Sequence, residues 1–371
     1  MRISTRRRMA AVALLALAGS ACDTGTAPDL EPDFDAQAAL ADYQTMQAAM
    51  ASDDLSPFQA LEGRTPFAST PAAIDVMASV SQSGHEVGSR AFALAAARRL
   101  LAASTEATRS GLGEPAQGPI ISGWHRGTTF VYDPGSDQYQ PDLEMEGAPA
   151  TGVRFILYEV DDTGTPIREM EIGYADLVDE GDGSVEDIVL RLTVVLEDET
   201  RLDYRITLDH DATSGALTVD GFFVGDDTRL DFDIALGLSQ IDGVGQAELD
   251  FHFGVESRGF SVAGHVSGIE ENDDGAGSFE LEVRHGGHTV AVEATGADGV
   301  IDGTIFVDGE AFATVTGPAG DPVIADPDGE ALTVSELQLL HRVVHGVEHA
   351  FRFLERLLDP VDEIVLLGFI L

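Results

Sequence analysis

The most extensive pattern in the chain is a two-residue alternation of apolar and polar positions, which runs from Gly152 to Gly317 in segments of about eight to twelve residues. Successive side chains of a strand point to opposite faces of its sheet, so each segment predicts a strand with one apolar and one polar face. One such segment places Leu202, Tyr204, Ile206 and Leu208 on a single face. The pattern therefore predicts a half-buried antiparallel sheet.

Short turns between these segments predict the register, because partners across one turn share a constant sum of residue numbers. The turns are Asp226–Asp227, Glu256 to Gly259, Gly286–Gly287 and Asp308–Gly309. Apolar residues face apolar residues across every turn. The predicted partners are Phe223 with Leu230, Val219 with Ile234, Phe253 with Val262, Val255 with Phe260, Asp250 with His265, Val283 with Val290, Leu281 with Val292, His285 with His288, and Ile305 with Phe312.

The fold class is predicted to be mainly β (α+β), with a long up-and-down antiparallel meander over residues 115–320. A meander of about twelve or more strands exceeds what an open twisted sheet usually holds without curling. We therefore expect a half-barrel or barrel with an apolar inner face, covered by helices. This plan is similar to that of the lipoprotein-localisation carriers of the bacterial envelope, although none of their motifs occurs in the chain.

Two helical regions flank the predicted sheet. Residues 34–110 form an alanine-rich helical layer, in which Leu40, Tyr43, Met46 and Met50 fall at helical spacing and Thr70 and Pro71 begin a later helix. Residues 330–358 predict a long amphipathic helix, followed by an apolar tail, residues 359–371, packed on the sheet. The apolar stripe of this C-terminal helix consists of Leu337, Leu340, Val344, Val347, Phe351, Leu354 and Leu358.

The N-terminus predicts export. Residues 1–21 combine four arginines with an apolar run that is shorter than the ~20 residues a spanning helix needs, as in a secretion signal peptide. The following segment, "LAGSAC", resembles the lipobox of bacterial lipoproteins and ends on Cys22, the only cysteine of the chain. The resemblance implies an acyl chain, such as palmitate, on Cys22. One departure is Gly19, which stands where the family usually has leucine, and ordinary signal-peptidase cleavage is the alternative.

Residues 22–33 are acidic and contain proline, which predicts an extended tether between the lipid and the folded body. Asp23, directly after the cysteine, resembles the inner-membrane retention signal of enterobacterial lipoproteins. That rule varies between bacterial lineages, so the predicted location is a bacterial membrane of the cell envelope, inner or outer.

Charge narrows the range of partners. The chain carries 21 basic residues, all of them arginine, against 65 acidic ones. Removal of the four signal-peptide arginines leaves 17 basic residues, so the mature net charge is 17 minus 65, or −48. Nucleic acid is excluded as a partner because its binding requires basic patches that neutralise phosphates.

One short motif indicates metal chemistry. His345, Glu348 and His349 have the spacing H-x-x-E-H, which resembles the zinc-binding helix of the inverzincin metallopeptidases. That family takes a third ligand from a second helix well downstream, whereas 371 minus 349, or 22, residues follow His349 here. The apolar stripe also turns these histidines to the opposite, polar face. We therefore prefer a solvated or docking face, with a zinc peptidase as the alternative.

Weaker candidates lie on the predicted sheet. Asp250 opposite His265 could orient an imidazole for acid–base work, with a surface ion pair as the simpler interpretation. His285 and His288 flank a turn and are weak metal candidates, with solvated side chains as the simpler interpretation. Trp124, followed by the turn at Asp133, predicts the first hairpin, with the indole in a core strand.

These features predict a lipid-anchored envelope protein with a non-enzymatic binding or structural role. No cofactor, catalytic residue or firm metal site is expected. The membrane is a partner through the N-terminal lipid, and the expected further partner is an apolar ligand, such as a lipid or acyl chain on the inner face of the sheet, or another envelope protein. The alternatives are the zinc peptidase and an outer-membrane β-barrel.

Overall fold

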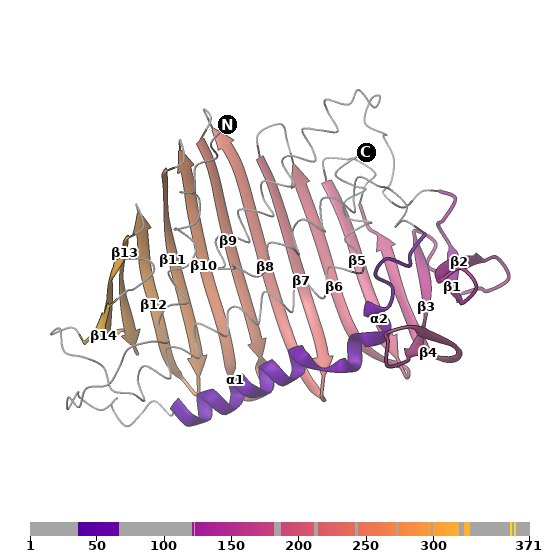
Figure 1. Cartoon of the computed structure of the whole chain (residues 1–371), viewed down its shortest axis with the longest axis horizontal. Helices are drawn as coiled ribbons and strands as arrows, with labels where there is room; N and C mark the ends of the chain where they lie inside the picture. The colour runs from indigo at the N-terminus through magenta and orange to yellow at the C-terminus, as the bar shows by residue number, and fades with distance from the viewer. Residues whose placement is uncertain are drawn as a thin grey trace, which may run out of the picture. The chain divides into compact units, whose positions relative to one another are not determined.

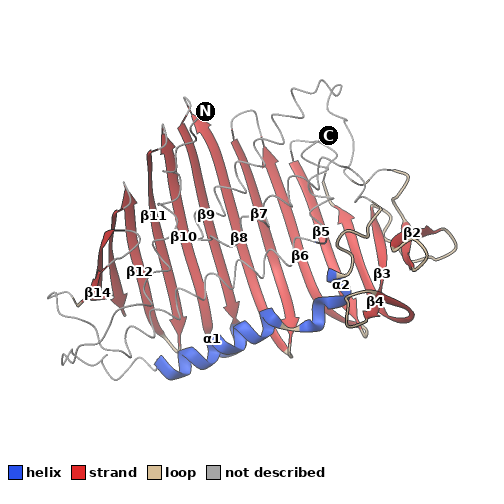
Figure 2. Cartoon of the chain, in the orientation of Figure 1, coloured by secondary structure: helices blue, strands red, loops and turns tan. Residues whose placement is uncertain are grey.

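The structure is a computed structural model that describes residues 36–66, 121, 123–181, 187–210, 214–241, 244–271, 274–297, 300–318, 323–326, 357 and 360. Strands make up most of this part of the chain, and helix α1 (Ala36–Ala51) is its longest helix (Figure 2). Short helices η2 (Asp53–Leu55) and α2 (Ser56–Gln59) follow α1 directly. The prediction of a mainly β fold with an N-terminal helix is confirmed.

Fifteen strands form a single sheet within the described residues, in the order β15-β14-β13-β12-β11-β10-β9-β8-β7-β6-β5-β4-β3-β1-β2. They are β1 (Thr128–Asp133), β2 (Gln138–Asp142), β3 (Gly152–Val160), β4 (Pro166–Asp179), β5 (Asp187–Leu196), β6 (Glu199–His210), β7 (Ser214–Gly225), β8 (Thr228–Ile241), β9 (Val244–Val255), β10 (Phe260–Glu271), β11 (Asp274–His285), β12 (His288–Ala297), β13 (Val300–Val307), β14 (Glu310–Pro318) and β15 (Val323–Ala325).

The sheet is open within the described residues, so the closed barrel, one of the two forms expected beside a half-barrel, is wrong. β2 and β15 are its two edge strands. Local features protect these edges from pairing with another chain. Pro141 lacks a backbone donor within β2, the Tyr139 amide donates to the Arg64 carbonyl, and β15 is only three residues long. Blunted edges let a long meander remain open without a partner strand.

The sheet is also mixed where a fully antiparallel one was expected. The neighbours from β3 to β7 and from β9 to β15 pair antiparallel in chain order, as the alternation predicts. The β1–β2 hairpin is the exception, because β1 pairs parallel with β3. A parallel pair needs a crossover and cannot be recognised from a turn signal.

The described residues divide into two compact units, with the boundary between Asp233 and Ile234 in β8. One unit holds residues 48–66, β1 to β7 and the start of β8. Its apolar face is buried, and the four residues that alternate along β6, from Leu202 to Leu208, are at most 2% exposed. The Tyr204 hydroxyl donates to the Leu357 carbonyl at 2.9 Å. Residue 357 therefore packs on this face.

The predicted C-terminal helix is not supported by the structure. Its range, 330–358, lies outside the described residues apart from Leu357, which is fully buried, and the apolar tail lies outside them apart from Pro360. The seven residues of the predicted apolar stripe are all outside the described part of the chain. Thr70, Pro71 and the rest of the helical layer beyond residue 66 are outside it as well.

The other unit holds residues 36–47 of α1 and the strands from β9 to β15, of which Figure 1 shows β9 to β14 in chain order. The register predicted for its hairpins is confirmed at two turns. Across Gly286–Gly287, Val283 faces Val290, Leu281 faces Val292 and His285 faces His288. Across the turn at η3 (Glu256–Arg258), Phe253 faces Val262, Val255 faces Phe260 and Asp250 faces His265.

The register predicted at the third turn of this unit is wrong. Asp308 and Gly309 do form the turn, but Ile305 faces Ala313 and Phe306 faces Ala311. Phe312 is therefore the extra residue of a β-bulge, which shifts the register by one position. Ala313 is fully buried in its place. In the first unit Asp226 and Asp227 also form their predicted turn, with φ values of 47° and 58°.

Helix α1 is amphipathic as its spacing predicts. Tyr43, Met46 and Met50 are between 0% and 9% exposed, and the sequence from Ala36 to Ala51 contains no glycine or proline. The helix ends at Ser52, whose hydroxyl accepts a hydrogen bond from the Asp54 amide and so begins the next turn. In the second unit Tyr43 packs against Phe260, with ring centroids 6.5 Å apart.

The first hairpin forms as predicted, but Trp124 is not in its core. β1 and β2 pair around the turn that follows Asp133. Trp124 lies in the turn before β1 and is 94% exposed. Gly127, with φ of 72°, ends that turn, and its amide donates to the Gly152 carbonyl at 2.8 Å. The left-handed glycine starts the strand at Thr128 and leaves the indole outside it.

Close cross-strand packing depends on Gly264. Gly264 faces Phe251 on β9 and Leu281 on β11, and a methyl group there would overlap the Phe251 ring. We expect Gly264→Ala to lower the free energy of unfolding by about 1–3 kcal/mol, because overpacking displaces a buried ring. Denaturant unfolding measures this change. Gly296→Ala is the matched control, since its nearest neighbour would be the Val300 carbonyl oxygen at 3.6 Å. Equal losses in both variants would contradict the packing role of Gly264.

Candidate functional site

Charged side chains form a row across four adjacent strands on the polar face of the second unit. Asp250 on β9 faces His265 on β10, His265 faces Glu280 on β11, and Glu280 faces Glu293 on β12. Residues that face each other across strands have Cβ atoms about 4.5–5.5 Å apart. The predicted register at the η3 turn thus brings Asp250 and His265 together, and the structure adds Glu280 and Glu293 to the same row.

His265 is the cation of this row. Its Nδ1 lies 2.7 Å from Asp250 Oδ1 and donates to it, and the two side chains are 34% and 60% exposed. The hydrogen bond to Asp250 raises the pKa of His265 above its usual value, and the charges of Asp250, Glu280 and Glu248 act in the same direction, while partial burial opposes them. His265 therefore keeps its proton to higher pH than a free histidine.

The carboxylates of the row outnumber its cations. Glu280 and Glu293 face each other directly, an arrangement of like charges that costs stability. Among the described residues, no salt bridge joins Glu248, Glu280 or Glu293 to an arginine. Arg258 and Arg284 are the only arginines between residues 244 and 318 of the sequence, and they pair with Asp42 and Glu282. This part of the polar face is strongly negative.

The first unit balances its charges differently. Arg154 binds Asp176 through two hydrogen bonds of 2.7 Å and stacks on the Tyr174 ring, with the guanidinium carbon 3.7 Å from the ring centroid. Arg191 likewise donates twice to Asp203, at 3.0 Å and 2.8 Å. Bidentate arginine pairs hold their charge at all physiological pH values. Histidine has that role beside Asp250 in the second unit.

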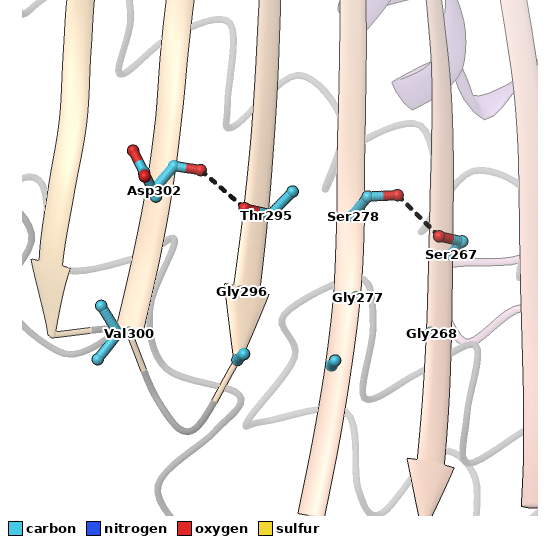
Figure 3. Close-up of a pocket in the computed structure, with 10 residues that line it drawn as sticks. Ser267, Gly268, Gly277, Ser278, Thr295, Gly296, Val300 and Asp302 are labelled. Atoms are coloured by element: carbon cyan, nitrogen blue, oxygen red, sulfur yellow. Dashed lines mark hydrogen bonds between the residues drawn. The ribbon is translucent and has the colours of Figure 1, made fainter.

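A shallow pocket with a volume of about 480 Å³ lies next to the charged row, at the ends of β10 to β13 that are farther from the η3 turn. Side chains alternate, so Ser267, Ser278, Thr295 and Asp302 share the face of His265 and Glu280. Figure 3 shows two hydrogen bonds among them, Ser267 Oγ to Ser278 Oγ at 2.7 Å and Thr295 Oγ1 to the Asp302 carbonyl at 3.4 Å. Small residues complete its lining, namely Gly268, Ala276, Gly277, Gly296 and Ala297, with Val300.

The serine hydroxyl and the imidazole of this site bind other partners than each other. Ser267 lies two residues from His265 on one strand, but its hydroxyl pairs with Ser278, and the imidazole pairs with Asp250. Nucleophilic catalysis needs a hydroxyl within hydrogen-bond reach of its base. The described residues show no such contact at this site. Its hydroxyls and carboxylates can together accept hydrogen bonds from an ammonium or guanidinium group.

The two turn histidines do not converge on a common point. His285 Nε2 lies 2.9 Å from Asp42 Oδ2 on α1, whereas His288 Nδ1 lies 2.7 Å from Asp308 Oδ2 in the next turn. Each imidazole thus has its own carboxylate partner. The described residues contain no group of three or more histidine, cysteine, aspartate or glutamate side chains placed to hold a metal ion.

The sequence motifs at both ends of the chain are not placed. Cys22, His345, Glu348 and His349 lie outside the described residues, so the lipid attachment and the zinc motif remain predictions. Two features of the site were missed in the sequence, namely the contacts of Asp42 and the pocket. The acceptor role of Asp42 depends on helix docking, which has no local signal. The pocket does have a signal, because small residues of "AGHVSG" and "GAGSFE" line it.

The pair between Asp250 and His265 can be tested by titration. We expect Asp250→Asn to lower the pKa of His265, because it removes the charged acceptor whose hydrogen bond is the largest cause of the raised pKa. NMR titration of the imidazole Cε1–H resonance measures the midpoint. Glu256→Gln, in the exposed η3 turn, is the control for an unspecific change of net charge. An unchanged midpoint in Asp250→Asn would show that the hydrogen bond is absent in solution.

No helix in the described part of the chain is both long and apolar enough to cross a membrane. Comparison with known proteins gives no relative: no protein-family model, no curated protein and no solved structure matches the chain.

Proposed function

We propose that this chain is a non-enzymatic protein of the bacterial cell envelope, anchored by a lipid on Cys22, that binds a cationic partner on its sheet. The proposed surface is the acidic face of β9–β13, defined as the side chains of Glu248, Asp250, Glu280, Glu293 and Asp302. The observation that carries the proposal is the excess of carboxylates on this face, which no arginine of the described residues balances.

Electrostatics determine the class of partner. Carboxylates held on adjacent strands add their fields, which raises the local concentration of cations and their rate of association. The overall charge of −44 repels nucleic acid and anionic lipid from the same surface. We therefore expect a partner that presents lysine or arginine side chains.

Burial supports the polar face over the apolar one as the binding surface. In this unit many large apolar side chains are covered, and Phe251, Phe253 and Phe260 are at most 3% exposed. Asp250, by contrast, keeps 60% of its side chain exposed. A partner can reach the acidic face of β9–β13 without any rearrangement of the core.

The proposed surface can be tested with decalysine as the probe and the unacylated Cys22→Ser chain as the protein. We expect Glu280→Gln/Glu293→Gln to weaken decalysine binding by roughly three- to tenfold, as the loss of two partly exposed charge contacts predicts. Calorimetry at low and high salt measures the affinity, which should fall as salt screens the charges.

The matched control is Glu144→Gln/Glu146→Gln, which removes the same charge from the exposed loop after β2. It should keep nearly the full affinity for decalysine. Equal weakening by both double variants would mean that the probe responds to net charge and not to the acidic face of β9–β13.

The anchor has its own test. We expect the wild-type chain, expressed in a bacterium, to partition with membranes and Cys22→Ser to become largely soluble, because one acyl-cysteine supplies the buried hydrocarbon. Detergent partitioning and the mass of the mature N-terminus measure this. Unchanged membrane association of Cys22→Ser would contradict lipid anchoring and leave the binding surface unaffected.

A further inference from the structure

Imidazoles take the place of arginine in several ion pairs of the second unit. Three histidine–aspartate pairs occur among its described residues: His265 with Asp250, His285 with Asp42, and His288 with Asp308. Each pair joins different elements, namely β10 to β9, β11 to α1, and β12 to the turn between β13 and β14. Unlike arginine, histidine carries its positive charge only when protonated, and its usual pKa is about 6.5.

The surroundings of His265 make its charge important. β9 presents Glu248, Asp250 and His252 toward it, and β11 presents Glu280 directly opposite and Glu282 diagonally, the latter paired with Arg284. Protonated His265 therefore lies between carboxylates on both neighbouring strands. Loss of its proton leaves Glu248, Asp250 and Glu280 close together without an intervening cation.

The other two pairs lie at strand ends. Asp42 accepts a hydrogen bond from Arg258 at 2.8 Å and forms an ion pair with His285, so one carboxylate joins α1 to the ends of two hairpins. Phe260 and His288 face His285 from the neighbouring strands. Asp308 accepts from His288 and also from the Thr289 amide at 2.8 Å.

We infer that β9 to β11 form a pH-sensitive segment, in which the connection between neighbouring strands weakens as His265, held between Asp250 and Glu280, loses its proton. This inference goes beyond the proposed binding function and does not depend on it. It requires only that the pair of His265 with Asp250 forms in solution.

The direction of the effect follows from linkage. The pKa of His265 is raised, so its contribution is complete below the unfolded value of about 6.5 and is lost as pH rises through the folded value. The hydrogen bond from His288 lowers the pKa of Asp308, so that contribution is present above about 3.9 and is lost as pH falls through the folded value. The segment is therefore most stable in mildly acidic solution.

Hydrogen exchange of the whole chain tests the inference, with β5 and β6 as an internal control. We expect protection factors, corrected for intrinsic exchange, to fall in β10 and β11 between about pH 5.5 and about pH 8.5, by roughly 1.5- to 5-fold. The strands β5 and β6, which are joined by the Arg191–Asp203 pair, should change less. A uniform change in all four regions, or none, would overturn the inference.

Two variants separate charge from packing at His265. His265→Arg keeps a positive charge at every pH and should reduce the pH dependence of β10 and β11, whereas His265→Gln should lower their protection already at about pH 5.5. Unaltered protection of β5 and β6 identifies variants that still fold. A pH dependence of β10 and β11 that persists fully in His265→Arg would contradict the assignment to His265.

Discussion

The whole architecture depends on a two-residue alternation that stays in register from strand to strand. A shift of one residue would move every apolar side chain of a strand to the polar face, so each turn must fix the pairing without an error of even one residue. Short left-handed turns supply this precision, for example Gly286–Gly287 with φ of 59° and 92°. Within the described residues, such turns join neighbouring strands of a fifteen-stranded sheet.

The same constraint creates the electrostatic problem of the molecule. An alternating strand places half of its residues on the polar face, and in this chain the charged residues at those positions are more often carboxylates than arginines. In the first unit arginine side chains form ion pairs with carboxylates on neighbouring strands, as Arg191 does with Asp203. In the second unit histidine performs this role beside Asp250, and Glu280 and Glu293 are left facing each other. The proposed binding surface and the proposed pH response both follow from this difference.

Much of the fold follows from the sequence because strand faces and tight turns are local. The pairing of His285 with His288, and that of Asp250 with His265, came from residue sums across a turn and are confirmed. The bulge at Phe312 could not be predicted, because Phe312 and Ala313 are both apolar and either one could face Ile305. The exposure of Trp124 was missed because its turn precedes the alternating region.

Long-range features were the least predictable. Closure of a sheet depends on accumulated twist and on the edge strands, and no local pattern encodes either, so the sequence could not decide between a barrel and an open sheet. The parallel pairing of β1 with β3 has no turn signal for the same reason. At the candidate site the alternation predicts which residues share the polar face, but the contact of Asp42 with His285 and Arg258 requires the docked helix.

The central claim is that the apolar face is a protein core and that the polar face meets the partner. Native mass spectrometry of the full, unacylated Cys22→Ser chain, purified from bacteria under gentle conditions, tests this claim most directly. The account predicts the bare protein mass without lipid adducts, because most of the large apolar side chains described in the sheet, such as Phe251 and Tyr204, are already buried. Stoichiometric lipid or fatty-acid adducts would contradict it and would assign the ligand to the apolar face.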